Sequence, residues 1–385
     1  MKQKLMDFLA DVHYDTAALE TEFKLEERMK RIPQNPVYHG EGDVWNHTKR
    51  VLEEIKKLPE WDFLDKEEKG ILSMAAFFHD IGKVRCTKEE DGQVISPKHA
   101  VTGAKMFREL CYKEYEAVFE ISFQEREEIA WLIRYHGLPC LFMEKEPVDV
   151  FLMRARECVR FPLLYLLAKA DILGRICGDS EQMLSSVDYF KEYCRELNCY
   201  EKKPAFANAY TRLRFYQGTR VWQRDCLYDE TEFPVYLMSG LPLAGKDTFI
   251  EEHLSEFPVI SLDEIREEWG IGPEDGSAAV AAEARERAKA YLRKKQPFVW
   301  NATNIISDTR RKLCSLFEGY GARVTILYIE APYEQLLQRN KIRARRVPVP
   351  VIDRMIGKMD MPDPAESYCV RYVAGDIRTE KERTL

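Results

Sequence analysis

Residues 234–248 read Pro-Val-Tyr-Leu-Met-Ser-Gly-Leu-Pro-Leu-Ala-Gly-Lys-Asp-Thr, an apolar run that turns through two glycines into a helical pattern. Gly240, four residues, Gly245 and Lys246 have the spacing of a phosphate-binding loop. Backbone N–H groups must wrap a polyphosphate in such a loop, and a side chain at either glycine would block that approach. Lys246 would place its charge on the β- and γ-phosphates, and the helix start adds the positive end of its dipole. The stretch therefore predicts a site for ATP or another NTP with Mg²⁺; the alternative is an ordinary Gly/Pro loop.

One position departs from this pattern. Asp247 stands where a Ser or Thr normally holds Mg²⁺, and Thr248 follows one residue late. We therefore expect Asp247 or Thr248 to contact the cation.

The pattern downstream of the loop alternates between strands and helices. We expect strands at 235–239, 258–262, 297–301 and 323–329, separated by helices at 246–255, 277–294, 306–318 and 332–344. Such alternation predicts an α/β domain in which a parallel sheet carries helices on both faces.

The first half of the chain has helical periodicity and no convincing series of strands. The main helices are expected at 43–58, 71–84, 100–121, 124–135, 149–157, 161–177 and 182–197. We therefore predict an all-α bundle over residues 1–200, a connecting segment over 201–233 and the α/β domain over 234–385.

Composition narrows the class of protein. The 385 residues carry a formal net charge of −7, which argues against indiscriminate nucleic-acid binding but allows a local basic groove. Ten scattered cysteines without a CxxC pair favour reduced thiols in a cytoplasm. The N-terminus lacks the apolar core of a signal peptide, and no apolar run approaches the length of a membrane span. We expect a cytoplasmic protein without a membrane partner.

His79 and Asp80 are adjacent within an apolar helical stretch. Burying an imidazole beside a carboxylate is costly unless a bound cation or a hydrogen bond compensates, and for the pair alone a hydrogen-bonded pair is the simpler interpretation. Further candidates fall on successive helices or helix ends, and the full set is His47, His79, Asp80, His99, His136 and Asp171. Such a nitrogen and oxygen set suits one or two divalent ions of Mn, Fe, Co, Ni, Zn or Mg, which activate water and polarise a phosphoryl oxygen.

The spaced set His47, His79-Asp80 and Asp171 is similar to the HD phosphohydrolase superfamily. The strings NPVYHGEGDVWNHT at 35–48 and FHDIGK at 78–83 resemble the HD domains attached to bacterial tRNA nucleotidyltransferases. The resemblance covers roughly residues 25–180. It implies four metal ligands, which are His47, His79, Asp80 and Asp171. It also implies that His99 and His136 serve a second metal or the phosphate, and that Lys83 faces the substrate phosphate. The catalytic head of the nucleotidyltransferases is absent from the sequence, so CCA addition is not expected.

Polar residues follow the expected strands of the second half. Asp263 comes just after a strand with Arg266 one helical turn on, so the carboxylate can accept the proton of an attacking hydroxyl while the Arg steadies phosphate charge. A helix-capping Asp with an exposed Arg is an equal alternative. Asn301-Ala302-Thr303-Asn304 ends another strand, and 338–346 is a basic run suited to a lid over ATP or to a solvated face.

Together these strings resemble the polynucleotide kinase branch of P-loop phosphotransferases over about residues 234–370. The resemblance implies that Lys246 binds phosphate, that Asp263 is the general base for a 5′-hydroxyl and that Arg266 contacts the acceptor-side phosphate. Arg339 and Arg343 would be lid arginines. Asn301 stands where relatives often carry Asp, which weakens the case for metal binding at that position.

An HD phosphohydrolase followed by a 5′-hydroxyl kinase resembles the bacterial HD-Pnk end-healing enzymes. The resemblance implies that broken RNA or DNA ends are the substrates, and that a separate RNA ligase joins the healed ends. Two alternatives remain open. In one, an HD nucleotidase is fused to a nucleoside or metabolite kinase. In the other, a non-catalytic HD domain binds RNA or senses nucleotides and regulates the kinase.

Overall fold

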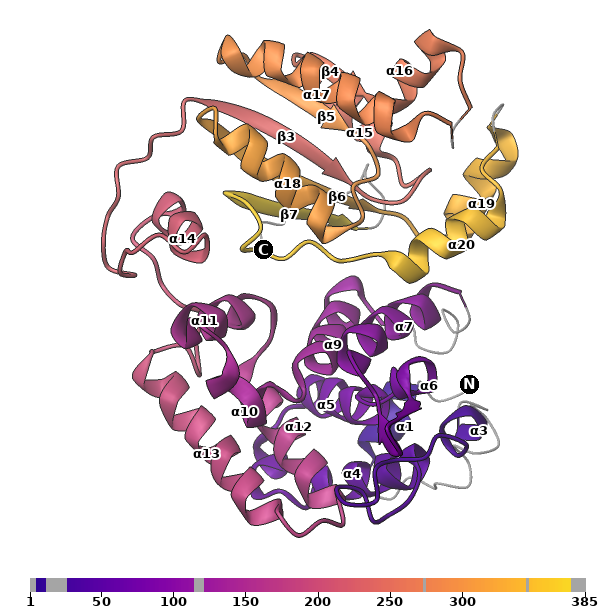
Figure 1. The fold of residues 1–385 in the computed structure, drawn as a ribbon, viewed down its shortest axis with the longest axis vertical. Helices are drawn as coiled ribbons and strands as arrows, with labels where there is room; N and C mark the ends of the chain where they lie inside the picture. Colours follow the sequence, from indigo (N-terminus) through magenta and orange to yellow (C-terminus); the bar gives the residue numbers. More distant parts are fainter. Residues whose placement is uncertain (1–4, 12–25, 114–120, 273–274, 344–345, 375–385) are drawn as a thin grey trace. The chain divides into compact units, whose positions relative to one another are not determined.

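The computed structural model describes residues 5–11, 26–113, 121–272, 275–343 and 346–374. The chain divides into two compact units, Met1–Pro204 and Ala205–Leu385 (Figure 1). The first unit is helical and the second is built on a parallel sheet, so the predicted fold class is confirmed.

The first unit is a bundle around long buried helices (Figure 1). Its helices are α1 (Leu5–Ala10), α3 (Glu26–Met29), α4 (Val44–Lys57), α5 (Lys66–Phe78), α6 (Lys83–Cys86), α7 (His99–Lys113), α9 (Phe123–Tyr135), α10 (Leu138–Leu141), α11 (Val148–Cys158), α12 (Phe161–Gly174) and α13 (Ser180–Glu196). The unit also contains two 3₁₀ turns, η1 (Pro59–Phe63) and η2 (Phe142–Glu144). Residues 114–120 of the helix predicted over 100–121 lie outside the described ranges.

The helix predicted over 71–84 is interrupted. Helix α5 ends at Phe78, and the chain makes tight turns through His79 and Asp80 before α6 begins at Lys83. These turns are closed by bonds from Ile81 N to Phe78 O and from Lys83 N to Asp80 O. The interruption matters because His79 and Asp80 are both candidate ligands.

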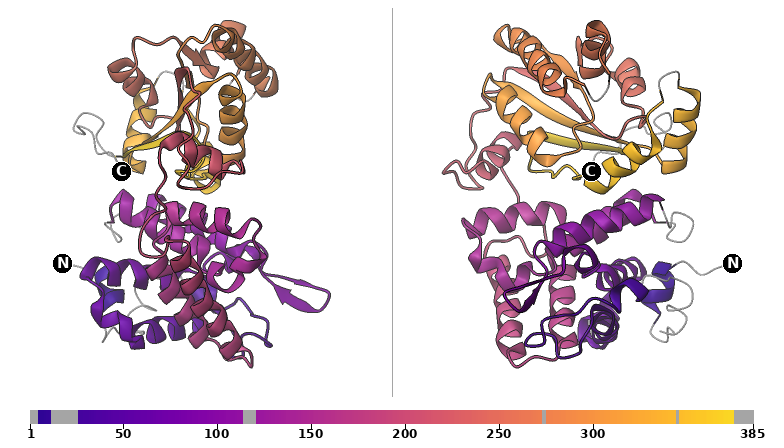
Figure 2. Two further views of the ribbon diagram at one scale, coloured as in Figure 1. Left: turned by 90° about the vertical axis from the view of Figure 1, so that its left-hand side faces the viewer. Right: turned by 45° about the vertical axis from the view of Figure 1, so that its right-hand side comes forward.

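A hairpin of two short strands also belongs to the helical unit, and the sequence analysis did not foresee it. Strand β1 (Lys88–Glu90) pairs antiparallel with β2 (Gln93–Ile95). Asp91 and Gly92 between them have positive φ values of 52° and 73°, which fits a tight hairpin turn. Figure 2 shows the hairpin standing away from the helices.

The second unit holds a five-stranded sheet in the order β4-β5-β3-β6-β7, and its pairs are all parallel. The strands are β3 (Phe233–Ser239), β4 (Val259–Ser261), β5 (Phe298–Asn301), β6 (Ala322–Glu330) and β7 (Cys369–Ala374). The first four were predicted from the sequence, and β7 was not. The helices of the second unit are α14 (Ala209–Tyr216), α15 (Lys246–His253), α16 (Leu262–Trp269), α17 (Ser277–Arg293), α18 (Ser307–Glu318), α19 (Tyr333–Ile342) and α20 (Val349–Lys358).

Alternate residues of the strands form one apolar face of this sheet. Val235 and Leu237 of β3 and Val324 and Ile326 of β6 share a buried cluster with residues of α17 and α18. The period of two places the intervening residues on the opposite face. The chain moves from β3 to β4 and β5 on one side and then returns to β6 on the other, so the carboxyl end of β3 is the point where the strand order reverses. Ligands bind at this position in open α/β sheets.

Candidate functional sites: a histidine-aspartate centre and a phosphate loop

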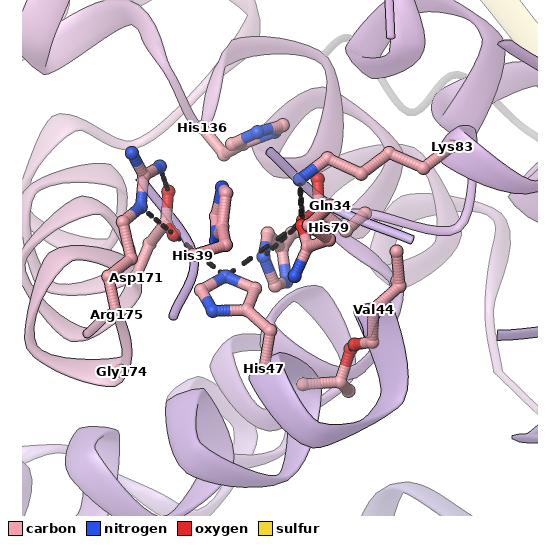
Figure 3. A network of polar contacts seen from close by, with 12 residues as sticks. Gln34, His39, Val44, His47, His79, Lys83, His136, Asp171, Gly174 and Arg175 are labelled. Carbon is pink, nitrogen blue, oxygen red and sulfur yellow. Dashed lines mark hydrogen bonds and ion pairs between the residues drawn. The ribbon is translucent and has the colours of Figure 1, made fainter. Parts of the chain in front are cut away.

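Five helices or helix ends bring the histidine-aspartate set together, as Figure 3 shows for most of its members. His47 lies in α4, which begins because the Asp43 carboxylate accepts the N–H of Asn46 at 2.8 Å. His79 and His136 cap the ends of α5 and α9, and Asp171 lies in α12. The six predicted residues are gathered in one place, although their sequence positions span more than a hundred residues.

Small residues allow these helices to approach closely. A Cβ on Gly82 would lie 2.0 Å from the carbonyl oxygen of His99 and 2.6 Å from the nitrogen of Gly103, so the start of α7 rests directly on the turn after Asp80. A Cβ on Gly174 would lie 2.8 Å from a Val51 side-chain carbon, so α12 approaches α4 equally closely. Glycine at these positions therefore lets the two pairs of ligand-bearing segments meet.

Three of the histidines are oriented in the same way. The Nδ1 atom of His79 lies 2.7 Å from the carbonyl oxygen of Ala76, and His99 and His136 make equivalent 2.8 Å contacts with Ser96 and Ile133. A carbonyl can only accept, so Nδ1 carries the proton and Nε2 of the neutral ring presents a lone pair. This is the usual arrangement of a metal-binding imidazole.

The Nε2 atoms of His79, His99 and His136 converge on one place. Among the residues that the structure describes, the buried His79 Nε2 finds no hydrogen-bond partner, and His99 Nε2 lies 3.3 Å from His136 Nε2. When both rings carry their protons on Nδ1, two Nε2 lone pairs meet, and a cation between them removes the repulsion. The residues therefore fit a divalent metal.

The ligand atoms form two adjoining groups, each within 4.8 Å: His47, His79 and Asp171, and Asp80, His99 and His136. Asp80 connects the groups, because Oδ2 lies 3.4 Å from His79 Nε2 and Oδ1 lies 3.5 Å from His99 Nε2. A carboxylate shared in this way suits a site for two metal ions as well as for one.

Basic side chains hold the two aspartates. Lys83 Nζ lies 2.7 Å from Asp80 Oδ2. Figure 3 shows that Lys83 also donates to Gln34 Oε1, at 2.5 Å, and that Arg175 donates to both oxygens of Asp171. Lys83 was expected to face the substrate phosphate; the structure pairs it with Asp80. Gln34, which the sequence analysis missed, fixes its position.

The protonation states favour cation binding. Burial opposes ionisation of Asp80 and Asp171, but the charges of Lys83 and Arg175 outweigh it and hold both pKa values well below the usual range. Burial, together with neighbouring His99 and His79, lowers the pKa of His136 to about 3. The carboxylates are therefore ionised and His136 is neutral, which are the forms that bind metal.

Glu41 is a second residue that the sequence analysis missed. Its Oε1 lies 2.8 Å from His39 Nδ1 and 2.9 Å from His47 Nδ1, and its Oε2 accepts the backbone N–H of Ile176 at 2.9 Å. The His47 contact is short but poorly aligned for a hydrogen bond. Glu41 thus connects His47 of α4 with Ile176, which follows α12. His47 also approaches α12 directly, because its Nε2 lies 3.0 Å from Asp171 Oδ1.

The phosphate loop in the second unit leaves the carboxyl end of β3. Gly240 has a φ of 146°, and a Cβ there would lie 2.3 Å from the carbonyl oxygen of Ile329. Gly245 has a φ of 107° and precedes α15, which begins at Lys246. The two predicted glycines therefore have backbone conformations that other residues rarely adopt.

The Lys246 ammonium is folded back along the loop. Its Nζ donates to the carbonyl oxygens of Gly240 at 3.1 Å and Leu241 at 2.8 Å. Burial lowers its pKa to about 8, against the opposing effects of Asp247 and Asp263.

The other predicted kinase residues surround this loop. The Asp263 carboxylate is 76% exposed and pairs with Arg266 at 3.0 Å. Arg339 donates to the carbonyl oxygen of Leu243 at 2.9 Å, so α19 contacts the loop directly. Arg343 is exposed at the end of α19, and its charge contributes to the lowered pKa of Lys246. Residues 344 and 345 of the predicted basic run lie outside the described ranges.

Asp247 and Asn301, the two departures from the usual pattern, contact each other. Asn301 Nδ2 donates to Asp247 Oδ1 at 2.7 Å. Thr248 is exposed on the first turn of α15.

Two known families match separate parts of the chain. Residues 44–157 match the HD domain family, and residues 235–362 match a family described as an AAA domain. The chain therefore joins an HD hydrolase domain to a P-loop kinase-like domain.

Three curated relatives match parts of the chain. The L-seryl-tRNA(Sec) kinase of Methanococcus maripaludis is 27% identical over 38% of this chain and 59% of its own length. The bifunctional uridylyltransferase/uridylyl-removing enzyme of Neisseria gonorrhoeae is 32% identical over 28% of this chain and 12% of its own. The multifunctional CCA protein of Thioalkalivibrio sulfidiphilus is 27% identical over 47% of this chain and 42% of its own. The chain thus spans less than two thirds of each.

Within the described ranges, no helix combines the length and the apolar character needed to cross a bilayer.

Proposed function

We propose that the chain is a bifunctional nucleic-acid end-healing enzyme of the HD-Pnk type. The HD domain would act as a metal-dependent phosphoesterase that opens a 2′,3′-cyclic phosphate and removes the terminal phosphate. The P-loop domain would transfer the γ-phosphate of ATP to a 5′-hydroxyl. A broken RNA strand carries both kinds of end, and a separate ligase would join the healed ends.

The phosphoesterase proposal depends on the converging Nε2 atoms of the HD domain. His47, His79, Asp80 and Asp171 would hold a divalent ion, and His99 and His136 would hold a second ion or the phosphate. The ion supplies Lewis-acid polarisation of phosphate and a water of lowered pKa. The charge on Lys83 is poised beside Asp80, where it can compensate the negative charge of a bound phosphate.

The observation that carries the kinase proposal is the position of Asp263. Its carboxylate lies just past β4 at the carboxyl edge of the sheet, is 76% exposed and acts electrostatically on Lys246. It can therefore accept a proton from an acceptor hydroxyl beside the phosphate loop. Arg266, paired with Asp263, can contact an acceptor-side phosphate, which a polynucleotide has and a nucleoside lacks.

Names among the relatives also support an RNA-linked substrate. One relative is described as an L-seryl-tRNA(Sec) kinase and another as a multifunctional CCA protein. A nucleoside or metabolite kinase fused to a nucleotidase is the competing function, and the acidic net charge of −7 favours it.

The acceptor assay separates these functions. The full chain is given labelled ATP and either a 5′-hydroxyl oligoribonucleotide, the matching oligodeoxyribonucleotide, a 3′-phosphorylated nucleoside or a nucleoside. The proposal expects transfer to oligonucleotides. Transfer to nucleosides alone would establish the small-molecule kinase instead.

The regulatory alternative is tested in the HD domain. Metal content is measured together with hydrolysis of a 2′,3′-cyclic phosphate end by the parent and by His79→Ala. We expect the parent to contain bound metal and His79→Ala to lose hydrolysis. An HD domain that binds no metal, with hydrolysis unchanged in His79→Ala, would instead support a non-catalytic sensor.

A further inference from the structure

The phosphate loop carries an acid at the position where a hydroxyl is expected. Asp247 is the second residue of α15, directly after the phosphate loop, and its side chain is exposed. A carboxylate beside a polyphosphate repels it unless a cation lies between them. A bound polyphosphate next to Asp247 would therefore require a cation between the carboxylate and the phosphates.

The strand beside the loop carries the complementary change. In P-loop kinases a loop Ser or Thr and an acidic residue on a neighbouring strand hold Mg²⁺ together. Here β5, the direct neighbour of β3 through the pair Leu237↔Trp300, ends on the amide Asn301. Compared with the usual arrangement, the acid stands in the loop, as Asp247, and the uncharged polar residue stands on the strand, as Asn301. The pair of positions therefore keeps one negative charge.

The geometry shows that the two residues act as a pair. Asn301 Nδ2 donates to Asp247 Oδ1 at 2.7 Å, although the residues are 54 positions apart. The bond occupies one carboxylate oxygen. Within the described part of the chain, Asp247 Oδ2 makes no hydrogen bond or ion pair. An oriented carboxylate with an available oxygen is a ligand that Mg²⁺ and Mn²⁺ prefer.

We propose that Asp247, oriented by Asn301, is the protein's carboxylate ligand to the divalent cation that accompanies ATP. This inference rests on the nucleotide site of the proposed kinase, and it is independent of which hydroxyl accepts the phosphate. Asn301 is the positioning residue, because it acts through Asp247.

The test is a reciprocal exchange in the full chain. Binding of Mn²⁺ in the presence of a non-hydrolysable ATP analogue is measured by electron paramagnetic resonance for the parent, Asp247→Ser, Asn301→Asp and the double variant. Asp247→Ser should weaken Mn²⁺ binding at least tenfold. The double variant restores the usual hydroxyl and acid arrangement and should recover most of the affinity. Asn301→Asp alone places two carboxylates in contact and should weaken binding of the analogue without metal.

Asp308→Ser is the matched control, because Asp308 is also an exposed acid in the first turn of a helix, α18. Its Mn²⁺ affinity should equal that of the parent. Equal affinity of Asp247→Ser and the parent, or a double variant no better than the single one, would overturn the inference while leaving the kinase intact. A parent that binds neither the analogue nor Mn²⁺ would overturn the nucleotide site and the proposed kinase together.

Discussion

The lowered pKa of Lys246 should make nucleotide binding at the proposed ATP site sensitive to pH. Burial among the loop carbonyls moves this pKa from 10.5 to about 8. The difference corresponds to about 3 kcal/mol, which is the cost of keeping the ammonium charged in the folded protein without ligand. Bound polyphosphate removes that cost, so above pH 8 each ATP should bind together with a proton. The affinity should then fall by about 20-fold between pH 7.5 and 9.5.

The same shift affects stability with a defined sign. Below pH 8 the lysine is protonated in both the folded and the unfolded chain, and the full penalty is present. Between pH 8 and 10.5 the unfolded chain binds more protons at this residue, so the free energy of unfolding rises with pH relative to a Lys246→Met variant.

Calorimetric titration with ATP at pH 9, in two buffers of different ionisation enthalpy, measures the proton uptake directly. We expect close to one proton per ATP for the parent. Lys246→Arg stays protonated throughout, so it should bind without this uptake. Equal uptake by the parent and Lys246→Arg would show that Lys246 does not take up the proton.

Three further changes test other parts of the structure. Asp263→Asn should lower the kinase rate by about 10²- to 10⁴-fold because the proton acceptor is lost, while ATP binding measured by calorimetry stays unchanged; a rate within threefold of the parent would exclude Asp263 as the base. Gly240→Ala should abolish ATP binding, because its Cβ would lie 2.3 Å from the Ile329 carbonyl oxygen at a φ of 146°. Gly82→Ala should reduce the metal content per chain, measured by mass spectrometry, because its Cβ would lie 2.0 Å from the His99 carbonyl oxygen and force α7 away from Asp80. Gly137→Ala is the control for both glycine variants, since nothing lies within 4 Å of its Cβ, and it should behave as the parent.

Local patterns were sufficient to predict much of the fold. The first four strands of the sheet and the loop after β3 follow from apolar runs bounded by glycine and proline, because the structure there is determined by neighbouring residues. The hairpin β1–β2 was missed although Asp91-Gly92 is a strong signal for a tight turn. Strand β7 was missed because its residues are mostly half-buried at the sheet edge and lack a long apolar run.

Contacts between distant residues could not be predicted in this way. The histidine-aspartate set was recognisable because residue types indicate chemistry. Glu41, however, is important through its contact with Ile176, 135 positions away, and Asp247 through Asn301. A carboxylate in a loop gives no sign of such partners. The fold determines them by placing α12 beside α4 and β5 beside β3.

In the proposed function, one chain carries two independent phosphate chemistries for broken nucleic acid. The most direct measurement follows both ends of one nicked RNA, with a labelled 2′,3′-cyclic phosphate and a 5′-hydroxyl, in the presence of ATP and Mg²⁺ with added Mn²⁺, Co²⁺, Ni²⁺ or Zn²⁺. The parent should process both ends, Asp80→Ala only the 5′ end and Lys246→Ala only the cyclic end. Loss of both activities from either folded variant, or no reaction of the parent at either end, would contradict two independent sites acting on broken nucleic acid.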